Sequence, residues 1–241
     1  VSPREILIGQ TLTLEGGRNA YGAAVAEGVA LQIDAANAAG GVNGRRLVLR
    51  VLDDENRAAT AEANARRLVA DGAFVLFGCV EGGPSTAVAK AASELGVPLF
   101  GPMAGSPGLR RPHLSMVFPL RAEHRDEFRA LLAHGRSIGM RRAAFWHADS
   151  DTGRQHLENV RIAAQELGME LVAAAPFRPD IDDAGLAAIA ETLAKAQPQM
   201  VFNHGSPGLY AKLIRSAPQR GLRSVFMGVN SGSAQIARAL G

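Results

Sequence analysis

The sequence predicts an α/β protein of two lobes, each of them a parallel sheet flanked by helices. Short apolar runs, typical of strands buried in a parallel sheet, recur along the 241 residues, and helical stretches stand between most of them. These elements form two blocks, residues 6–101 and 143–228, on either side of a less regular stretch. Alternation of strand and helix over such lengths indicates stacked βαβ units.

Strands are expected where a short apolar run ends at a polar or Gly-rich connection. They cover residues 6–9, 47–52, 74–78, 98–101, 143–147, 171–175, 200–203 and 225–228. Helices are expected where apolar residues recur at spacings of three and four, and Gly closes several of them. They cover residues 20–39, 58–70, 85–95, 123–138, 152–167, 184–196 and 207–216.

The boundary between the lobes is expected near residues 118–121, where the less regular stretch 102–121 ends. Lobe one would then hold residues 1–119 and lobe two residues 120–241.

Composition places the chain among globular proteins, because 47% of its residues are apolar and 20% are charged. The net charge of +3 comes from Lys and Arg scattered among Asp and Glu, so no basic face indicates a nucleic-acid partner. No apolar run approaches the ~20 residues of a membrane span, so no direct membrane insertion is expected. The single cysteine, Cys79, excludes an intramolecular disulfide and a Cys-based metal cluster.

A Gly-rich turn is expected to open the helix that follows residue 77. Ligands of open parallel sheets gather at the carboxyl ends of strands, beside helix N-termini. Gly82 and Gly83 would let a ligand approach the main chain, Pro84 suits a first helical turn, and Ser85 adds a hydroxyl. Such a turn can hold a carboxylate without an arginine, although the same residues also suit a plain tight connection.

A second small and polar loop follows the strand that ends near residue 100. Its candidate contact residues are Met103, Ala104, Gly105 and Ser106. This loop could face the first turn across a shared crevice, or it could be an ordinary Pro/Gly loop.

In the second block, Asp149 and Asp151 stand at the start of a helix, where they are candidate ligand contacts or N-caps. A calcium loop is excluded because Gly153 and Val160 stand where acidic ligands are needed. A metal site is not expected, because His147 and His156 lack the spacing that places two ligands on one helix face.

Catalytic motifs are also missing from the sequence. No G-x-S-x-G elbow is present, and no motif places a base beside Cys79, which is expected to be a free structural thiol. The G-x-G-x-x-G and Walker A motifs are absent, so no nucleotide or other cofactor is expected.

Several segments together resemble the branched-chain amino acid binding family of ABC-transporter solute receptors, which have the type I periplasmic binding protein fold. The most specific is the run Gly40-Gly41-Val42-Asn43-Gly44-Arg45, with Asp53-Asp54 after the next strand. The opening strand, the Gly-rich turn, the Gly101-Pro102 loop and the turn that ends at Gly153 follow in the family's order. The likeness covers essentially the whole chain.

The resemblance implies ligand contacts in both lobes. They are Tyr21, Gly82, Gly83, Ser85 and Met103 to Ser106 in lobe one, and Thr152, Ser206 and Asn230 in lobe two. The chain departs from the family's amino acid binders, since Thr152 and Ser206 replace aromatic residues and Asn230 replaces the acid that receives the α-ammonium. An amino acid ligand would then need Asp149 or Asp151 as its anion, and an organic or aromatic acid is the alternative.

The resemblance further implies a receptor with no catalysis, periplasmic or extracellular, that captures a small molecule between its lobes for the membrane permease of an ABC importer. A sensor of the same bilobal fold, coupled to a signalling partner, is the alternative. Family members are longer, so the chain is expected to lack the return segment that completes lobe one. No signal peptide stands at its start, which fits a mature start or a cytoplasmic protein.

Overall fold

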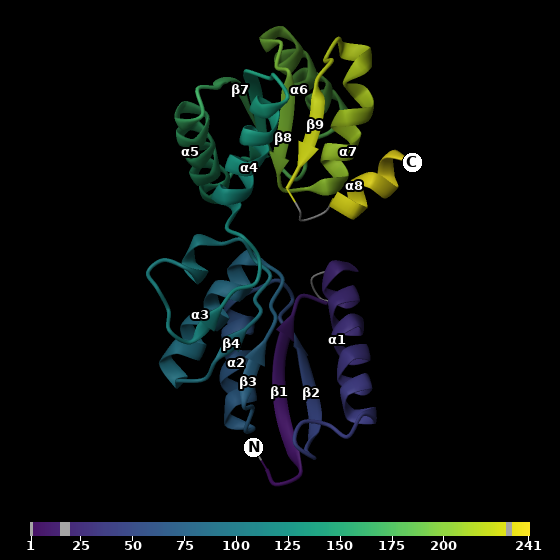
Figure 1. Cartoon of the computed structure of the whole chain (residues 1–241). Coiled ribbons are helices and arrows are strands. Elements are labelled where there is room, and N and C mark those ends of the chain that lie inside the picture. Colours follow the sequence, from purple (N-terminus) through teal and green to yellow (C-terminus); the bar gives the residue numbers. More distant parts are fainter. Residues whose placement is uncertain (1, 15–19, 230–232) are drawn as a thin grey trace. The chain divides into compact units, whose positions relative to one another are not determined.

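The computed structural model describes residues 2–14, 20–229 and 233–241 and divides the chain into two compact units. Unit one is Val1–Glu123 and unit two is His124–Gly241 (Figure 1). The division falls a few residues beyond the boundary expected at residue 119.

Two interactions hold residues 120–123, which lie between the expected and the observed boundary, in unit one. The guanidinium group of Arg110 donates to the carbonyl oxygen of Arg121, and Arg111 forms an ion pair with the buried carboxylate of Glu123. These contacts bind the segment to the loop 101–112, so the chain leaves unit one only after Glu123.

Unit one contains a five-stranded, all-parallel sheet of order β2-β1-β3-β4-β5. Its strands are β1 Glu5–Leu12, β2 Arg46–Asp53, β3 Val75–Phe77, β4 Leu99–Phe100 and β5 Val117–Phe118. Its helices are α1 Ala20–Ala38, α2 Ala58–Ala70, α3 Gly82–Leu95 and the 3-10 turn η1 Pro107–Leu109. Figure 1 shows α1 on one side of this sheet and α2 with α3 on the other.

The core of unit one lies on the α2 and α3 side of the sheet. Leu76, Leu99 and Val117 occupy neighbouring positions on adjacent strands and are buried against alanine-rich faces of the two helices. Because successive residues of a strand point to opposite faces, Phe100 and Phe118 project from the other face and are about half exposed.

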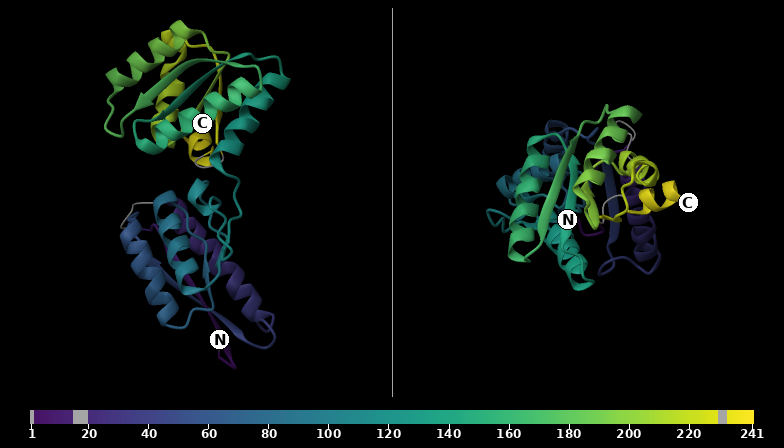
Figure 2. Two further views of the ribbon diagram at one scale, coloured as in Figure 1. Left: turned by 90° about the vertical axis from the view of Figure 1, so that its left-hand side faces the viewer. Right: turned by 90° about the horizontal axis from the view of Figure 1, so that it is seen from above.

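Unit two contains a four-stranded, all-parallel sheet of order β7-β6-β8-β9. Its strands are β6 Arg142–Ala148, β7 Glu170–Phe177, β8 Met200–His204 and β9 Val225–Gly228. Its helices are α4 His124–Ser137, α5 Asp151–Glu166, α6 Asp183–Ala196, α7 Pro207–Ser216, the 3-10 turn η2 Pro218–Arg220 and α8 Ser233–Leu240. Figure 2 gives two further views of the helices around each sheet.

Both faces of the unit-two sheet are buried. Phe145 and Phe202 pack with Phe128 of α4 on one face, whereas Trp146 packs on the other face with Phe177 and Tyr210. This two-sided burial explains the nearly continuous apolar sequence of β6 and β8.

The two-lobed parallel α/β class expected from the sequence is confirmed. The structure adds β5 and α8, which the sequence did not predict, and begins α3 at Gly82 rather than at Ser85. Among the described residues, no helix is both long and apolar enough to cross a membrane.

Candidate functional site

In unit one, the two connections that follow β3 and β4 lie side by side, as the first of the two interpretations of the loop 103–106 requires, because β3 and β4 are neighbours in the sheet. The backbone N–H of Met103 donates to the carbonyl oxygen of Cys79 at 2.8 Å, which joins the two connections directly. The helix start and the loop also touch, since a Cβ at Gly82 would lie 2.7 Å from the Oγ of Ser106. A side chain at position 82 would therefore clash with Ser106, so the packing of the protein itself requires glycine there.

The first turn of α3 offers backbone donors to this region. The first hydrogen bond of the helix runs from the N–H of Ser85 to the carbonyl of Glu81 at 2.9 Å. A helix leaves the N–H groups of its first residues without an intrahelical acceptor, and here those residues are Gly82 and Gly83, because Pro84 has no N–H. A Cβ at Gly83 would meet no protein atom within 4 Å, so the main chain there is open to approach.

Tyr21 of α1 reaches the same loop. Its hydroxyl group lies 3.7 Å from the sulfur of Met103, and its side chain is 48% exposed. The structure thus groups Tyr21, Gly82, Gly83, Met103 and Ser106 around the carboxyl ends of β3 and β4.

Three other candidates of unit one are buried. Ser85 is fully buried, Ala104 packs in the core, and Gly105 is buried in the loop. The hydroxyl group of Ser85 therefore does not face solvent, and Ala104 and Gly105 can offer only main-chain atoms.

Polar residues that the sequence reasoning missed lie buried at the same edge of the sheet. Neither polar atom of the Gln10 amide has a hydrogen-bond partner among the described residues, and its Nε2 lies 3.2 Å from the Cβ position of Gly78. Asp54 accepts a bond of 2.7 Å from the hydroxyl of Thr13, while its Oδ2 is buried and unpaired within the described chain. Burial raises the pKa of Asp54 above its usual range, although the Thr13 bond opposes this shift.

Arg110 positions the loop 103–106. Its guanidinium group donates to the carbonyl oxygens of Ala104 at 3.3 Å and Ser106 at 3.1 Å. The sequence offered no signal for this role, because Arg110 follows the loop in an irregular stretch.

In unit two, Ser150 and not an aspartate caps α5, since its hydroxyl oxygen accepts the N–H of Gly153 at 3.1 Å. The interpretation of Asp149 or Asp151 as N-cap is therefore wrong. Both carboxylates instead bind Arg154, at 3.2 and 2.6 Å respectively, on the protein surface.

The remaining candidates of unit two lie at strand ends or outside the described chain. Thr152 is exposed in the first turn of α5. Ser206 precedes α7 with a left-handed φ of 30°, a conformation that costs a non-Gly residue of order 1–3 kcal/mol. Asn230 lies outside the described residues.

Three histidines meet at the carboxyl edge of the unit-two sheet. Nitrogen atoms of His124, His156 and His204, one from each ring, all lie within 4.8 Å of one another. Burial and the neighbouring His124 and His147 lower the pKa of His156 to about 4, so its ring is neutral at neutral pH. The spacing of His147 and His156 in the sequence could not reveal the group of His124, His156 and His204, because these three residues stand on three different elements.

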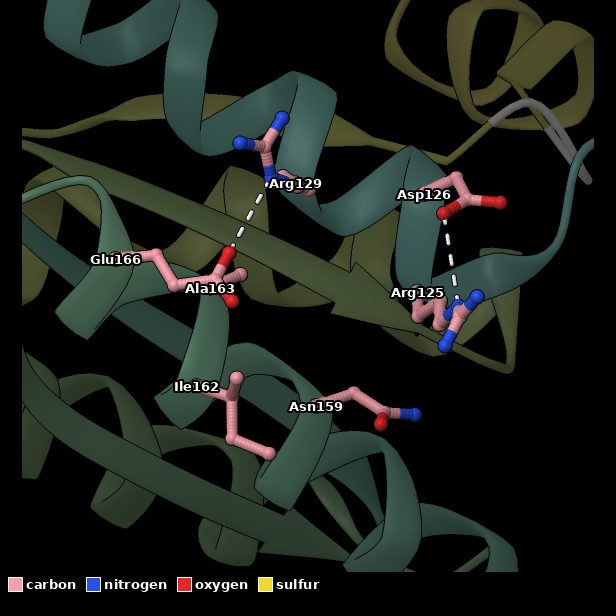
Figure 3. Close-up of a pocket in the computed structure, with 7 residues that line it drawn as sticks. All are labelled: Arg125, Asp126, Arg129, Asn159, Ile162, Ala163 and Glu166. Carbon is pink, nitrogen blue, oxygen red and sulfur yellow. Dashed lines mark hydrogen bonds and ion pairs between the residues drawn. The ribbon is translucent and has the colours of Figure 1, made fainter.

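A separate pocket of about 270 Å³ lies between α4 and α5 (Figure 3). Its charged lining residues are paired on the surface, Arg129 with Glu166 at 3.4 Å and Arg125 with Asp126 at 3.6 Å. This pocket is a groove between two helices and not a strand-end site.

Two parallel α/β units with open strand ends, and a helix N-terminus beside a small-residue loop, define a class of ligand-binding proteins. Residues 5–241 match the periplasmic binding protein family, and the chain belongs to that family. The resemblance found in the sequence is thereby confirmed. The family is one of ligand-binding receptors and not of enzymes.

Two curated relatives match part of the chain. Leu/Ile/Val-binding protein homolog 3 of Brucella melitensis is 32% identical over 114 residues, which are 47% of this chain and 31% of that protein. Leu/Ile/Val-binding protein BraC3 of Rhizobium johnstonii is 33% identical over 129 residues, which are 54% of this chain and 35% of that protein. The match spans about a third of either relative's length.

Solved structures share the fold at low sequence identity. A substrate-binding periplasmic protein of Ralstonia solanacearum has a TM-score of 0.81 at 23% identity, over 98% of this chain and 67% of that one. A branched-chain amino acid transporter substrate-binding protein of Streptococcus pneumoniae, in complex with isoleucine, has a TM-score of 0.81 at 19% identity, over 98% and 68%.

Proposed function

We propose that this chain is the ligand-binding part of an extracytoplasmic solute receptor that takes up a small carboxylate ligand, an amino acid or an organic acid, for the permease of an ABC importer. Membership of the periplasmic binding protein family supports the receptor role. The names of the two partial relatives, both Leu/Ile/Val-binding proteins, favour an amino acid.

The observation that supports a carboxylate ligand is the position of the start of α3 beside the loop 103–106. Two backbone N–H groups, of Gly82 and Gly83, are available at the positive end of a helix, and Ser106 lies next to Gly82. Neither the segment 78–86 nor the segment 101–107 contains Arg or Lys. An anion bound here would be met by main-chain donors and hydroxyl groups.

An amino acid ligand differs from an organic acid in its ammonium group, which the protein would also have to bind. In unit two, the carboxylates of Asp149 and Asp151 are engaged with Arg154, and an amino acid ligand that used either would have to displace that guanidinium. An organic acid needs no such exchange. Thermal-shift screening against amino acids and small carboxylates separates the two classes, because a ligand at 100 times its Kd adds about 2.7 kcal/mol of stability.

The first prediction concerns Gly83→Val. The Cβ position of Gly83 meets no protein atom, so the fold should survive, while a branched side chain would cover the N–H groups that the carboxylate needs. We expect affinity for the ligand found by screening to fall by far more than the roughly 0.5–1.5 kcal/mol of one neutral hydrogen bond. Calorimetry with the acid, its methyl ester and its amide measures this, with circular dichroism as the folding control.

Gly28→Val provides the matched control. Gly28 lies inside α1 of the same unit, and its Cβ position also meets nothing within 4 Å. The Gly28 variant should bind like the wild type. Equal affinity for acid and ester, or unchanged affinity in Gly83→Val, would place the carboxylate elsewhere.

A further inference from the structure

We propose that His124, His156 and His204 of unit two form a binding site for a divalent transition-metal ion such as Zn²⁺. This site is independent of the proposed carboxylate site, because all three residues belong to unit two.

The fold brings the three rings together from three elements. His204 is the last residue of β8, and the alternation of that strand places it on the same face as Met200 and Phe202, which pack toward α4 and α5. His156 lies one helical turn before the buried Val160 on the inner face of α5, and His124 is the first residue of α4.

The spacing of the rings suits a shared ion. Their centroids lie 4.1 to 5.1 Å apart in edge-on pairs, and the candidate ligand nitrogens lie within 4.8 Å of one another. Tetrahedral zinc with Zn–N bonds of about 2.0–2.1 Å holds its nitrogens about 3.4 Å apart. Small side-chain rotations would close that difference.

His156 supplies an independent sign of a missing partner. Its side chain is 2% exposed, and neither ring nitrogen has a hydrogen-bond partner among the described residues. Burying an imidazole without any partner is costly, because both of its nitrogens lose their bonds to water. Coordination of one nitrogen to a metal would remove part of that cost.

The groups around the three rings include a carboxylate that could orient a metal-binding histidine and an apolar ring. Nδ1 of His124 lies 3.1 Å from a carboxylate oxygen of Glu127, a pairing that would fix the ring and leave Nε2 for the ion. On the other side, Phe128 contacts all three histidine rings and forms an apolar wall.

The ligand type selects the class of ion. Three neutral imidazoles suit Zn²⁺, Co²⁺, Ni²⁺ or Cu²⁺, whereas Mg²⁺ and Ca²⁺ prefer oxygen ligands. Three protein ligands leave a fourth tetrahedral position for water or another small ligand. The competing interpretation is an aromatic cluster in which His156 only packs against Phe128, and that cluster would not bind metal.

The second prediction tests this site with Co²⁺ as the spectroscopic probe. Untagged protein, freed of metal with a chelator, should bind one equivalent of Co²⁺ and develop the visible absorption bands of tetrahedral cobalt. Added Zn²⁺ should displace them. His124→Asn, His204→Asn and His156→Phe should each weaken Co²⁺ binding at least tenfold, and Glu127→Gln by about 10- to 100-fold.

His134→Asn is the control, because His134 is exposed on the same helix as His124. It should leave both the bands and the stoichiometry unchanged. Circular dichroism shows which variants fold, and the two Asn variants keep the test decisive if His156→Phe does not. Absence of the bands in the wild type, or equal loss in His134→Asn, would overturn the proposal.

Discussion

In unit one, the buried polar atoms without partners among the described residues lie near the candidate site; unit two holds as many, on Trp146, His156 and Asn203. The amide of Gln10, Oδ2 of Asp54 and the hydroxyl of Ser85 are all buried and unpaired among the described residues. Each unsatisfied group costs about 1–3 kcal/mol. Such groups do not serve stability, so their position supports a binding role for this edge of the sheet.

The third prediction concerns Asp54 and pH. Because burial raises the pKa of Asp54, the native state keeps its proton to higher pH than the unfolded state does. The stability contributed by protonated Asp54 is therefore present at acidic pH and is lost as pH rises through its folded pKa. We expect the free energy of unfolding of the wild type, relative to Asp54→Asn, to fall as pH rises from about 4 to 7.

Urea unfolding of both proteins over this pH range measures the difference, and other titrating groups cancel in it. Asn keeps the oxygen that accepts from the hydroxyl of Thr13 and from the N–H of Asn56. A difference that stays constant, or that grows with pH, would contradict the raised pKa.

At the residue scale, the sequence predicted which residues lie close together better than it predicted which side chains are exposed to solvent. The loop 103–106 could either face the turn at Gly82 or be an ordinary Pro/Gly loop, and the structure places Ser106 next to Gly82. Ser85 was expected to offer a hydroxyl, but the helix starts three residues before it and turns its side chain inward. Sequence spacing does not determine which side of a first helical turn faces the core.

At the scale of the element, one sheet face of unit one carries an exposed apolar patch. Phe77 stacks on Phe100 with ring centroids 6.2 Å apart, Phe118 is the partner of Phe100 on β5, and Leu120 lies beside Gly101. Leu120 is 67% exposed. Contiguous apolar surface of this kind binds apolar probes.

The fourth prediction tests this patch with Phe118→Thr. Thr favours strands and keeps the β5 backbone, while it removes a half-exposed ring, so stability should change by less than about 1 kcal/mol. Fluorescence of the dye ANS bound to the native protein should fall by more than half. Ile138→Gln, at an exposed position just after α4 in unit two, should not change it. Equal fluorescence in wild type and Phe118→Thr would disprove the assignment of the patch.

Some element boundaries followed from local signals, whereas β1 runs three residues beyond the end predicted at residue 9 and α3 begins three residues before its predicted start. The helix α2 and the strand β9 have the bounds that the sequence predicted. The strand β5 was missed because two residues cannot show alternation, and they lie in a Pro-rich stretch. The His124, His156 and His204 group was missed because its members stand on three elements, and only the packing of α4 and α5 on the sheet joins them.

At the scale of the whole molecule, each unit has cores of its own and one residue that reports on it. Cys79 is buried in the core of unit one, and its burial, with the charge of Asp54, raises the pKa of its thiol. Trp146, the sole tryptophan of the sequence, is fully buried in unit two between Phe177 and Tyr210. Separate cores predict that the units unfold as separate cooperative bodies.

The fifth prediction uses both reporters. Cys79 should react with a thiol reagent only when unit one opens. Leu99→Ala, in the same core, removes about 2–5 kcal/mol and should speed labelling roughly 30-fold or more. The midpoint of the Trp146 fluorescence change in urea should stay where it is. Leu193→Ala, fully buried in unit two, should do the reverse, lowering that midpoint with little effect on labelling. If Leu193→Ala accelerated Cys79 labelling as much as Leu99→Ala does, the chain would unfold as one cooperative body.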